Sequence, residues 1–267
     1  MAARRALNLI TIQRAPLRRQ LEVARLAGYD GVGLWVEQTA QVARGSGGLQ
    51  GIRGLLDENG LVPAELCFVG GWMYPEPGQC EPAHDRARQA FQMAQGLGCE
   101  CVVACASGGS GDLEDAASDL AGLCALAREF GVKVALEFLG GAQQVKDVAT
   151  AWRIVDMAGA RNGGLLIDTF HFYKGGSQVA DLEPIPADCI YLLHVNDCPD
   201  IPREELEDRH RSFPGTGIIP LESIAAVVVD KGYRGFFSLE LFNEEYWAAD
   251  PYTVAQEGIR SLQRNGL

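Results

Sequence analysis

The 267-residue sequence lacks the features that would assign it to a membrane, secreted or dinucleotide-binding class. It has no run of about 20 apolar residues, so it offers no candidate membrane span. The amino-terminal stretch MAARRALNLITIQRA is interrupted by polar residues, which makes it a poor signal peptide and favours a cytoplasmic protein. No GxGxxG motif follows the first predicted strand, so we expect no nucleotide cofactor.

Paired cysteine motifs are also missing. No CxxC pair occurs among the eight cysteines, and Cys67, Cys101, Cys105 and Cys189 lie inside apolar runs. Thiols in such runs are typical of a reduced core. A disulfide framework is the alternative, and this placement disfavours it.

Basic residues are fewer than acidic ones in this sequence. The chain carries 23 Lys and Arg against 35 Asp and Glu, a formal net charge of −12. Such a protein repels a phosphate backbone unless a basic patch offsets the charge, and the dense basic stretches, Arg4–Arg5 and residues 14–19, are short. We therefore expect a small neutral or anionic metabolite as partner, with no nucleic acid and no membrane.

Short apolar runs alternate with longer segments of helical period along the whole chain. The predicted strands are residues 6–12, 30–36, 61–69, 101–106, 133–138, 164–168, 190–196 and 235–241. The predicted helices are residues 17–27, 51–59, 82–97, 113–130, 148–158, 221–231 and 251–262, with a weak, short helix after residue 168.

This alternation belongs to the α/β class and requires a parallel sheet, because crossover helices make consecutive strands run the same way. Eight strand–helix units close best into a barrel. No linker or low-complexity block divides the chain, so we expect a single-domain (β/α)8 TIM barrel over residues 1–267. A doubly wound open sheet is the alternative.

Charged and polar side chains end four successive predicted strands. In a parallel barrel the carboxyl ends of the strands meet at one rim, where active sites lie. Two glutamates, an aspartate and a histidine would then share one mouth, and an oxygen-rich set of this kind suits a divalent metal ion. These four rim residues are Glu137, Asp168, His194 and Glu240.

A purely structural network is the alternative for the four rim residues. Three carboxylates buried side by side repel one another and lose their hydration. None of the four strand ends carries a Lys or Arg that would pair with them. A bound cation removes this conflict, so the sequence predicts a metal site.

Further side chains near the strand ends are candidates for substrate contact. His171 and Asp197 each follow a rim residue by three positions, as residues that orient ligands or move protons do; a loop histidine without a role is the alternative for His171. The segment EDRHRSFPGTGIIPL (207–221) offers arginines for a substrate oxygen, or it is a solvated loop. Aromatic residues at or after strand ends could form the apolar walls of a site for a sugar ring, and core packing is the alternative. These residues are Trp35, Trp72, Tyr74 and Trp247.

Several of these stretches resemble the xylose isomerase-like barrel superfamily, also called AP endonuclease family 2 barrels, and most closely its 2-keto-myo-inositol (inosose) isomerase branch. The resemblance covers nearly all of the carboxyl-terminal half, whereas the amino-terminal half matches only in its barrel pattern. The resembling stretches are LEFLG (136–140), LIDTFHFYKGG (166–176), HVNDCPD (194–200), DRHRSFPGTGIIPL (208–221) and SLELFNEEYW (238–247).

The resemblance implies that the four rim residues bind one divalent cation. Hard oxygen ligands with one imidazole favour Mn²⁺ or Mg²⁺, while Zn²⁺ or Co²⁺ would also fit. It further implies that Glu137 and Glu240 are an acid/base pair, that His171 contacts substrate and that Arg211 binds a substrate oxygen. Arg209 remains an alternative to Arg211, because DRHRSFPGTG contains both. Relatives also suggest a homo-oligomer.

The expected activity is therefore isomerisation or epimerisation of a keto-sugar or keto-cyclitol through an enediolate, with proton transfer by the two glutamates. The nearest rival is a lyase like the inosose dehydratases. A DNA-repair nuclease of the AP endonuclease type is a second rival, in which His171, Asp208 and His210 would complete a further metal site. A non-catalytic sugar-binding barrel is the third.

Overall fold

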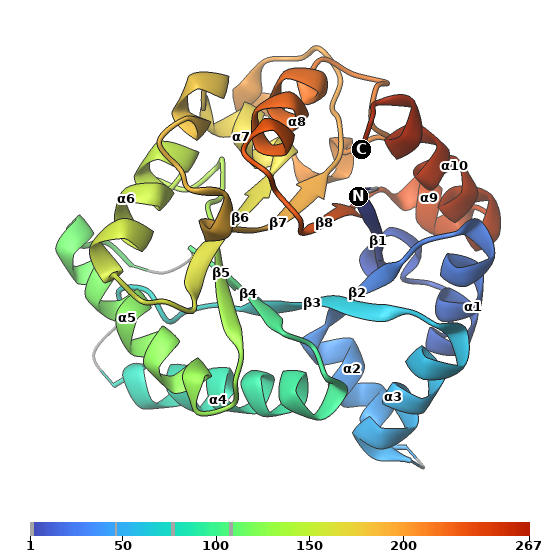
Figure 1. Ribbon diagram of the computed structural model, residues 1–267, viewed down its shortest axis with the longest axis horizontal. Helices are drawn as coiled ribbons and strands as arrows, with labels where there is room; N and C mark the ends of the chain where they lie inside the picture. The colour runs from blue at the N-terminus through green and yellow to red at the C-terminus, as the bar shows by residue number, and fades with distance from the viewer. Residues whose placement is uncertain (1–2, 46, 76–77, 107–108) are drawn as a thin grey trace.

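Eight parallel strands form one closed barrel in the computed structural model, which describes residues 3–45, 47–75, 78–106 and 109–267. The strands pair in chain order from β1 to β8, and β8 closes on β1, as Figure 1 shows. Their bounds are β1 Arg4–Asn8, β2 Gly31–Trp35, β3 Val62–Val69, β4 Cys101–Cys105, β5 Lys133–Glu137, β6 Gly163–Asp168, β7 Ile190–Val195 and β8 Phe236–Leu239. The predicted TIM barrel is confirmed.

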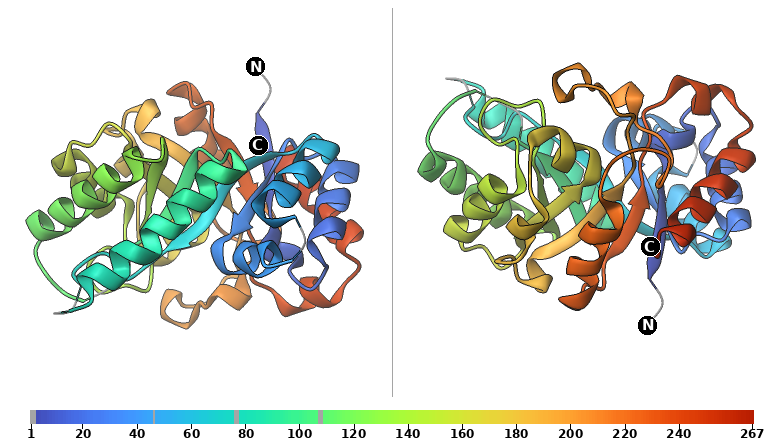
Figure 2. Two further views of the ribbon diagram at one scale, coloured as in Figure 1. Left: turned by 90° about the horizontal axis from the view of Figure 1, so that it is seen from below. Right: turned by 90° about the horizontal axis from the view of Figure 1, so that it is seen from above.

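Helices surround the barrel (Figures 1 and 2). Their bounds are α1 Leu17–Ala27, α2 Val36–Ala43, α3 Gly48–Asn59, α4 Cys80–Leu97, α5 Leu113–Arg128, α6 Val148–Ala158, α7 Thr169–Gly175, α8 Leu221–Asp230, α9 Glu244–Ala248 and α10 Pro251–Arg264. Short 3-10 turns join them: η1 Leu9–Ile12, η2 Val179–Leu182, η3 Ala187–Cys189, η4 Arg203–Glu205 and η5 Asp208–His210. In the described ranges, no helix combines the length and the apolar character needed to cross a bilayer.

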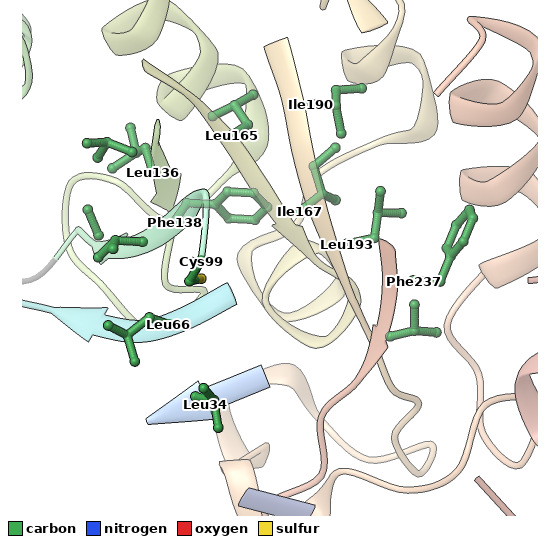
Figure 3. Packing of buried hydrophobic residues seen from close by; sticks show 14 of the residues in the cluster. Leu34, Leu66, Cys99, Leu136, Phe138, Leu165, Ile167, Ile190, Leu193 and Phe237 are labelled. Carbon is green, nitrogen blue, oxygen red and sulfur yellow. The ribbon is translucent and has the colours of Figure 1, made fainter. Parts of the chain in front are cut away.

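The apolar core has two layers, because successive side chains of a strand point to opposite faces. The larger layer packs between the barrel and its helices, and Figure 3 shows part of it, including Leu66, Leu165 and Phe237. The smaller layer fills the barrel interior with small residues and cysteines, among them Cys67 and Cys105. All eight cysteines have free thiols, as expected for a reduced core.

The first strand is shorter than predicted. It ends at Asn8, and residues Leu9–Ile12 form η1 instead of continuing the strand. The side-chain oxygen of Asn8 accepts a hydrogen bond from the Ile10 backbone N–H at 3.2 Å, which caps the turn. Apolar periodicity alone does not reveal this break, since all four residues of η1 are buried. Helices α2 and α9 were also not predicted.

The start of β1 and the carboxyl-terminal end of the chain lie close together (Figure 1). The Arg5 side chain donates a hydrogen bond to the Leu267 carbonyl across this contact. The contact lies at the end of the barrel where β1 begins. The rim with the candidate site is at the opposite end, where the strands finish.

Candidate metal centre

The four rim residues meet at the carboxyl-terminal mouth of the barrel. Glu137 and Asp168 are the last residues of β5 and β6, His194 lies next to the end of β7, and Glu240 follows β8. All four side chains are buried, and one ligand atom of each lies within 4.8 Å of the others. His194 Nδ1 is 3.1 Å from Glu240 Oε2, 3.8 Å from Glu137 Oε1 and 3.9 Å from Asp168 Oδ2.

Strand pairing and a helix cap fix this arrangement. Asp168 pairs with His194 across β6 and β7, so the two side chains arrive at the same level of the rim. Asp168 is also the N-cap of α7, because its Oδ1 accepts the His171 backbone N–H at 2.9 Å. This explains why the apolar strand ends on an aspartate with a histidine three residues later: one carboxylate ends the strand and starts the helix.

The donor set fits a divalent metal ion. Two ligands about 2.1 Å from one ion lie roughly 3–3.5 Å apart, close to the distance between His194 Nδ1 and Glu240 Oε2. These two atoms have no hydrogen-bond geometry, and no group in the described residues hydrogen-bonds either nitrogen of His194. A buried imidazole nitrogen that faces three carboxylates suits a cation, which would bind all four groups at once.

Burial and mutual repulsion shift the proton affinities of the cluster. Burial raises the pKa of Glu137 to about 8, and Glu240 and Asp168 add to the rise while His194 opposes it. Burial would also raise the pKa of Asp168, but Arg211, followed by His171 and His194, holds that pKa below its usual range. Burial lowers the pKa of His194, yet Glu240, Cys67 and Glu65 together raise it well above normal. Protons therefore occupy part of the cluster at neutral pH.

Metal affinity should rise with pH. A ligand must lose its proton to bind a cation, and the Glu137 carboxyl carries a proton below about pH 8. Each unit of pH below that value should therefore weaken the apparent affinity about tenfold for each proton released. Titration of chelator-treated protein with Mn²⁺ or Zn²⁺ at pH 6, 7 and 8 by calorimetry measures this slope. An affinity independent of pH across this window would contradict the prediction.

Arg211 supplies a cation that the strand ends do not contain. Its side chain is buried, and Nη1 lies 2.5 Å from Asp168 Oδ2 and 3.3 Å from Glu240 Oε2. The carboxylates therefore have a basic partner that their strand ends do not contain, because it comes from the loop after β7. Arg211 leaves Glu137 unpaired, and one guanidinium does not neutralise three carboxylates.

Arg211 also links the cluster to a cavity. Its Nη2 lies 3.2 Å from His171 Nε2 and 3.1 Å from Asp208 Oδ1. His171 and Asp208 line a cavity of about 820 Å³ that extends over α7 and under the loops after β3, β4 and β5. Arg211 thus lies between this cavity and the carboxylates, and its planar donors suit a substrate oxygen. Arg209 also lines this cavity, but 67% of its side chain is exposed, and it pairs with Glu207.

The further metal site considered for a nuclease does not form. His210 Nδ1 accepts the Glu207 backbone N–H at 3.0 Å and so stabilises the η5 turn. His171 and Asp208 both contact Arg211, which places a guanidinium where a second ion would have to lie. Within the described residues, neither His171 nor His210 belongs to a group with metal-ligand spacing.

The aromatic candidates have different positions. Trp35 is half-buried at the end of β2, where its Nε1 donates to Asn8 Oδ1 at 2.7 Å. Because Asn8 Nδ2 also donates to Glu240 at 3.2 Å, Trp35 lies one side chain away from the cluster. Trp72 is only 3% exposed and packs in the core, and its predicted substrate contact stays a prediction. Its neighbours Met73 and Tyr74 line the cavity instead.

Asp197 organises a loop. Its carboxylate oxygens accept the backbone N–H groups of four residues at 2.9–3.0 Å: Cys198, Gly215, Gly217 and Ile219. Its backbone also forms a bridge with Ser212. Both oxygens are used within the protein, so Asp197 stabilises this loop, and its predicted substrate contact stays a prediction. The loop that it holds follows Arg211.

Replacing Asp197 with alanine should destabilise the protein by about 2–4 kcal/mol, because four N–H groups lose a charged acceptor. Urea unfolding measures the loss, and amide exchange should show faster exchange at Gly217 and Ile219. A variant that keeps its stability and its exchange protection but binds substrate poorly would instead support direct substrate contact.

Three buried side chains around the cluster were missed in the sequence. Asn8 contacts Glu240, as above, and Asn196 Nδ2 donates to Asp168 Oδ2 at 3.2 Å. Glu65 lies on β3, with its Oε1 3.6 Å from His194 Nε2. The glutamate inside the apolar run LVPAELCFV indicates a buried carboxylate, but the predicted metal ligands came from the ends of the later strands alone.

The family model for xylose isomerase-like TIM barrels matches residues 21–265. The chain belongs to this family. A 3-dehydroshikimate dehydratase of Pseudomonas aeruginosa is 31% identical over 254 residues, which is 92% of this chain and 39% of that protein. An inosose isomerase of Halalkalibacterium halodurans is 40% identical over 142 residues, which is 53% of this chain and 49% of that protein.

This xylose isomerase-like chain spans about half or less of the length of the curated relatives that it matches. Among solved structures, an IOLI protein with a bound zinc atom superposes with a TM-score of 0.91 at 24% identity, over 98% of this chain and 97% of that one. An L-ribulose 3-epimerase superposes with a TM-score of 0.79 at 20% identity, over 98% of this chain and 94% of that one. At these identities the likeness supports the fold alone.

Proposed function

We propose that this chain is a divalent-metal-dependent isomerase or epimerase of a keto-sugar or keto-cyclitol, similar in activity to inosose isomerase. The observation that carries the proposal is the cluster of the four rim residues, in which two glutamates flank a buried histidine and aspartate. Two carboxylates at one metal site suit a reaction that removes a proton from one face of a carbon and returns one elsewhere.

The four rim residues would hold one divalent cation, with Mn²⁺ or Mg²⁺ favoured by the oxygen donors and Zn²⁺ or Co²⁺ also fitting. When bound, the cation polarises the substrate carbonyl and stabilises the negative charge that develops when the neighbouring carbon loses its proton. Glu137 and Glu240 move the proton: one removes it and the other returns it.

The remaining groups would position the substrate. Arg211 directs guanidinium N–H groups between the cluster and the cavity, where a carbonyl or hydroxyl oxygen can accept them. His171, with its Nδ1 buried and unbonded within the described residues, offers a second polar contact. The cavity of about 820 Å³ is large enough for a sugar or cyclitol ring, and its lining mixes polar side chains such as Gln144 and Lys174 with apolar ones.

Loss of water is the second candidate reaction. The 3-dehydroshikimate dehydratases of Pseudomonas aeruginosa and Pseudomonas putida each match 92% of this chain, whereas the inosose isomerase matches cover about half of it. A dehydratase begins with the same proton removal next to a carbonyl and then expels a β-hydroxyl. The rim residues serve both outcomes, so the product separates them.

Proton exchange in D₂O tests the proposal. Metal-loaded protein is incubated with 2-keto-myo-inositol, a panel of ketohexoses and 3-dehydroshikimate, and substrate C–H signals and products are followed by NMR. We expect deuterium at the carbon next to the carbonyl, together with an isomerised or epimerised product. Water loss would support the dehydratase, and absence of exchange with every substrate would overturn the proposed function.

A further inference from the structure

A fourth buried carboxylate lies beneath the three of the candidate metal centre. Glu65 on β3 is completely buried, and it faces the interior of the barrel, on the Nε2 side of His194. Its Oε1 accepts hydrogen bonds from Ser238 Oγ at 2.8 Å and from Asn8 Nδ2 at 3.3 Å. Burial of a carboxylate is costly unless charge or hydrogen bonds compensate for lost hydration, so this position requires a reason.

The barrel is shaped to accept the Glu65 carboxylate. The register between β2 and β3 shifts between Val32 and Gly33, so that Gly33 pairs with Glu65. A bulge of this kind changes the direction in which side chains point, and at this one Glu65 points into the barrel. A Cβ atom at position 33 would overlap Glu65 Oε1. Glycine at this position therefore leaves the space that the carboxylate fills.

Unsatisfied buried atoms gather between Glu65 and His194. Five buried side-chain atoms have no hydrogen-bond partner within the described residues, and three of them are Glu65 Oε2 and both ring nitrogens of His194. His194 Nδ1 faces the other rim residues, while Nε2 lies 3.6 Å from Glu65 Oε1. Closing this gap by about half an ångström gives hydrogen-bond distance. A metal-bound imidazole commonly donates its other N–H to a carboxylate in this way.

We propose that Glu65 is a positioning residue for the metal centre: its carboxylate accepts the Nε2–H of His194 and thereby holds the tautomer whose Nδ1 lone pair is directed at the metal ion. The inference rests on the proposed metal-dependent function. A neutral imidazole has one N–H and one lone pair, so an acceptor at Nε2 determines which nitrogen is free to bind. The nearby carboxylate also makes the imidazole a stronger ligand.

A second cation is the competing use of the same groups. Glu65, Cys67 and His194 have ligand atoms within 4.8 Å of one another. An ion there, together with one among the rim residues, would require His194 to bind metal through both nitrogens and to give up its last ring proton. The burial that raises the pKa of the Cys67 thiol well above normal also opposes a thiolate ligand. A proton between Glu65 and His194 requires neither a fully deprotonated imidazole nor a thiolate at Cys67.

Metal binding by three proteins tests the inference: wild type, Glu65→Gln and Glu65→Leu. The glutamine variant keeps a weaker, uncharged acceptor, whereas the leucine variant removes it. We expect Zn²⁺ affinity, measured by chelator competition, to fall in the order wild type, Glu65→Gln, Glu65→Leu, with a total loss of about 10–100-fold. In ¹⁵N-labelled Zn²⁺-loaded protein, His194 should show a protonated Nε2 in the wild type and altered ring ¹⁵N shifts in Glu65→Leu. Gln20→Leu is the control, because it removes a buried polar side chain whose hydrogen bonds within the described residues go to the Leu9 and Ile12 carbonyls.

The outcomes separate this inference from the function on which it rests. If wild type binds no divalent ion, both the proposed function and the role of Glu65 fail. If wild type binds one ion and the Glu65 variants bind it as tightly, with unchanged His194 shifts, only the role of Glu65 fails. A wild type that binds two ions, one of which is lost in Glu65→Leu, makes Glu65 a ligand instead of an acceptor. Should the leucine variant fail to fold, the nearly isosteric glutamine variant carries the comparison.

Discussion

Replacing Glu240 or Glu137 with glutamine is expected to lower the rate of substrate C–H exchange by about 10²–10⁴-fold or more. Proton transfer by a positioned side chain contributes a factor of this size, and each glutamate is also expected to hold the cation. Glutamine has nearly the same shape but cannot accept and return the proton. Exchange in D₂O, followed by NMR with the best substrate of the panel, measures the effect.

The matched control is Glu222→Gln, which makes the same change at an exposed residue in the first turn of α8. Metal content of each variant must be measured alongside, because loss of the ion would also stop exchange. A Glu240 variant that binds metal but has lost exchange supports the proton-transfer role. Exchange at the wild-type rate in either rim variant, with metal bound, would remove the proposed acid/base pair.

Replacing Arg211 with methionine is expected to destabilise the metal-free protein at neutral pH by about 3–5 kcal/mol. The cause is the loss of a buried guanidinium that pairs with Asp168 and Glu240, which leaves carboxylates buried without their partner. Methionine keeps much of the volume without the charge. Denaturant unfolding of chelator-treated protein measures the difference, and added divalent metal should recover more stability in the variant than in the wild type.

Arg209→Met is the matched control two residues away. Arg209 is exposed, and in the described part of the chain its ion pair is with exposed Glu207. Surface ion pairs of this kind contribute about 0–1 kcal/mol. The pair of variants also tests which arginine contacts substrate, a choice that the sequence left open. A loss of stability in Arg211→Met no larger than that in Arg209→Met would contradict the proposed role of the buried guanidinium. An exchange rate reduced only by Arg209→Met would favour Arg209 as the substrate contact.

These two sets of variants address different parts of the centre. The glutamate variants test the proposed proton transfer, whereas the Arg211 variant tests the charge balance of a cluster with three rim carboxylates. Glu65 lies on the opposite side of His194 from that cluster and concerns the direction of the imidazole. The cluster thus has a guanidinium on one side of its carboxylates and a further carboxylate on the Nε2 side of the histidine.

The fold and the four rim residues could be predicted from the sequence because both depend on local patterns. Alternating apolar runs and helical segments determine a parallel sheet, and glycines such as Gly28 and Gly98, with φ of 95° and 72°, end helices in a conformation that other residues rarely adopt. Once the strands are parallel, their last residues meet at one rim whatever the sequence of the loops. The sequence therefore predicted that the four rim residues lie close together, as they do in the structure: Glu137, Asp168, His194 and Glu240.

The partners of these residues were decided only by the tertiary structure. Arg211 reaches the cluster because Asp197 holds the following loop through four backbone N–H groups, an arrangement with no periodic signal. Glu65 faces the interior where the register shifts opposite Gly33, and a bulge cannot be read from an apolar run. Trp72 turns into the core although it follows a strand. Each case depends on contacts between segments far apart in the chain, whose geometry is set by packing and not by local sequence preference.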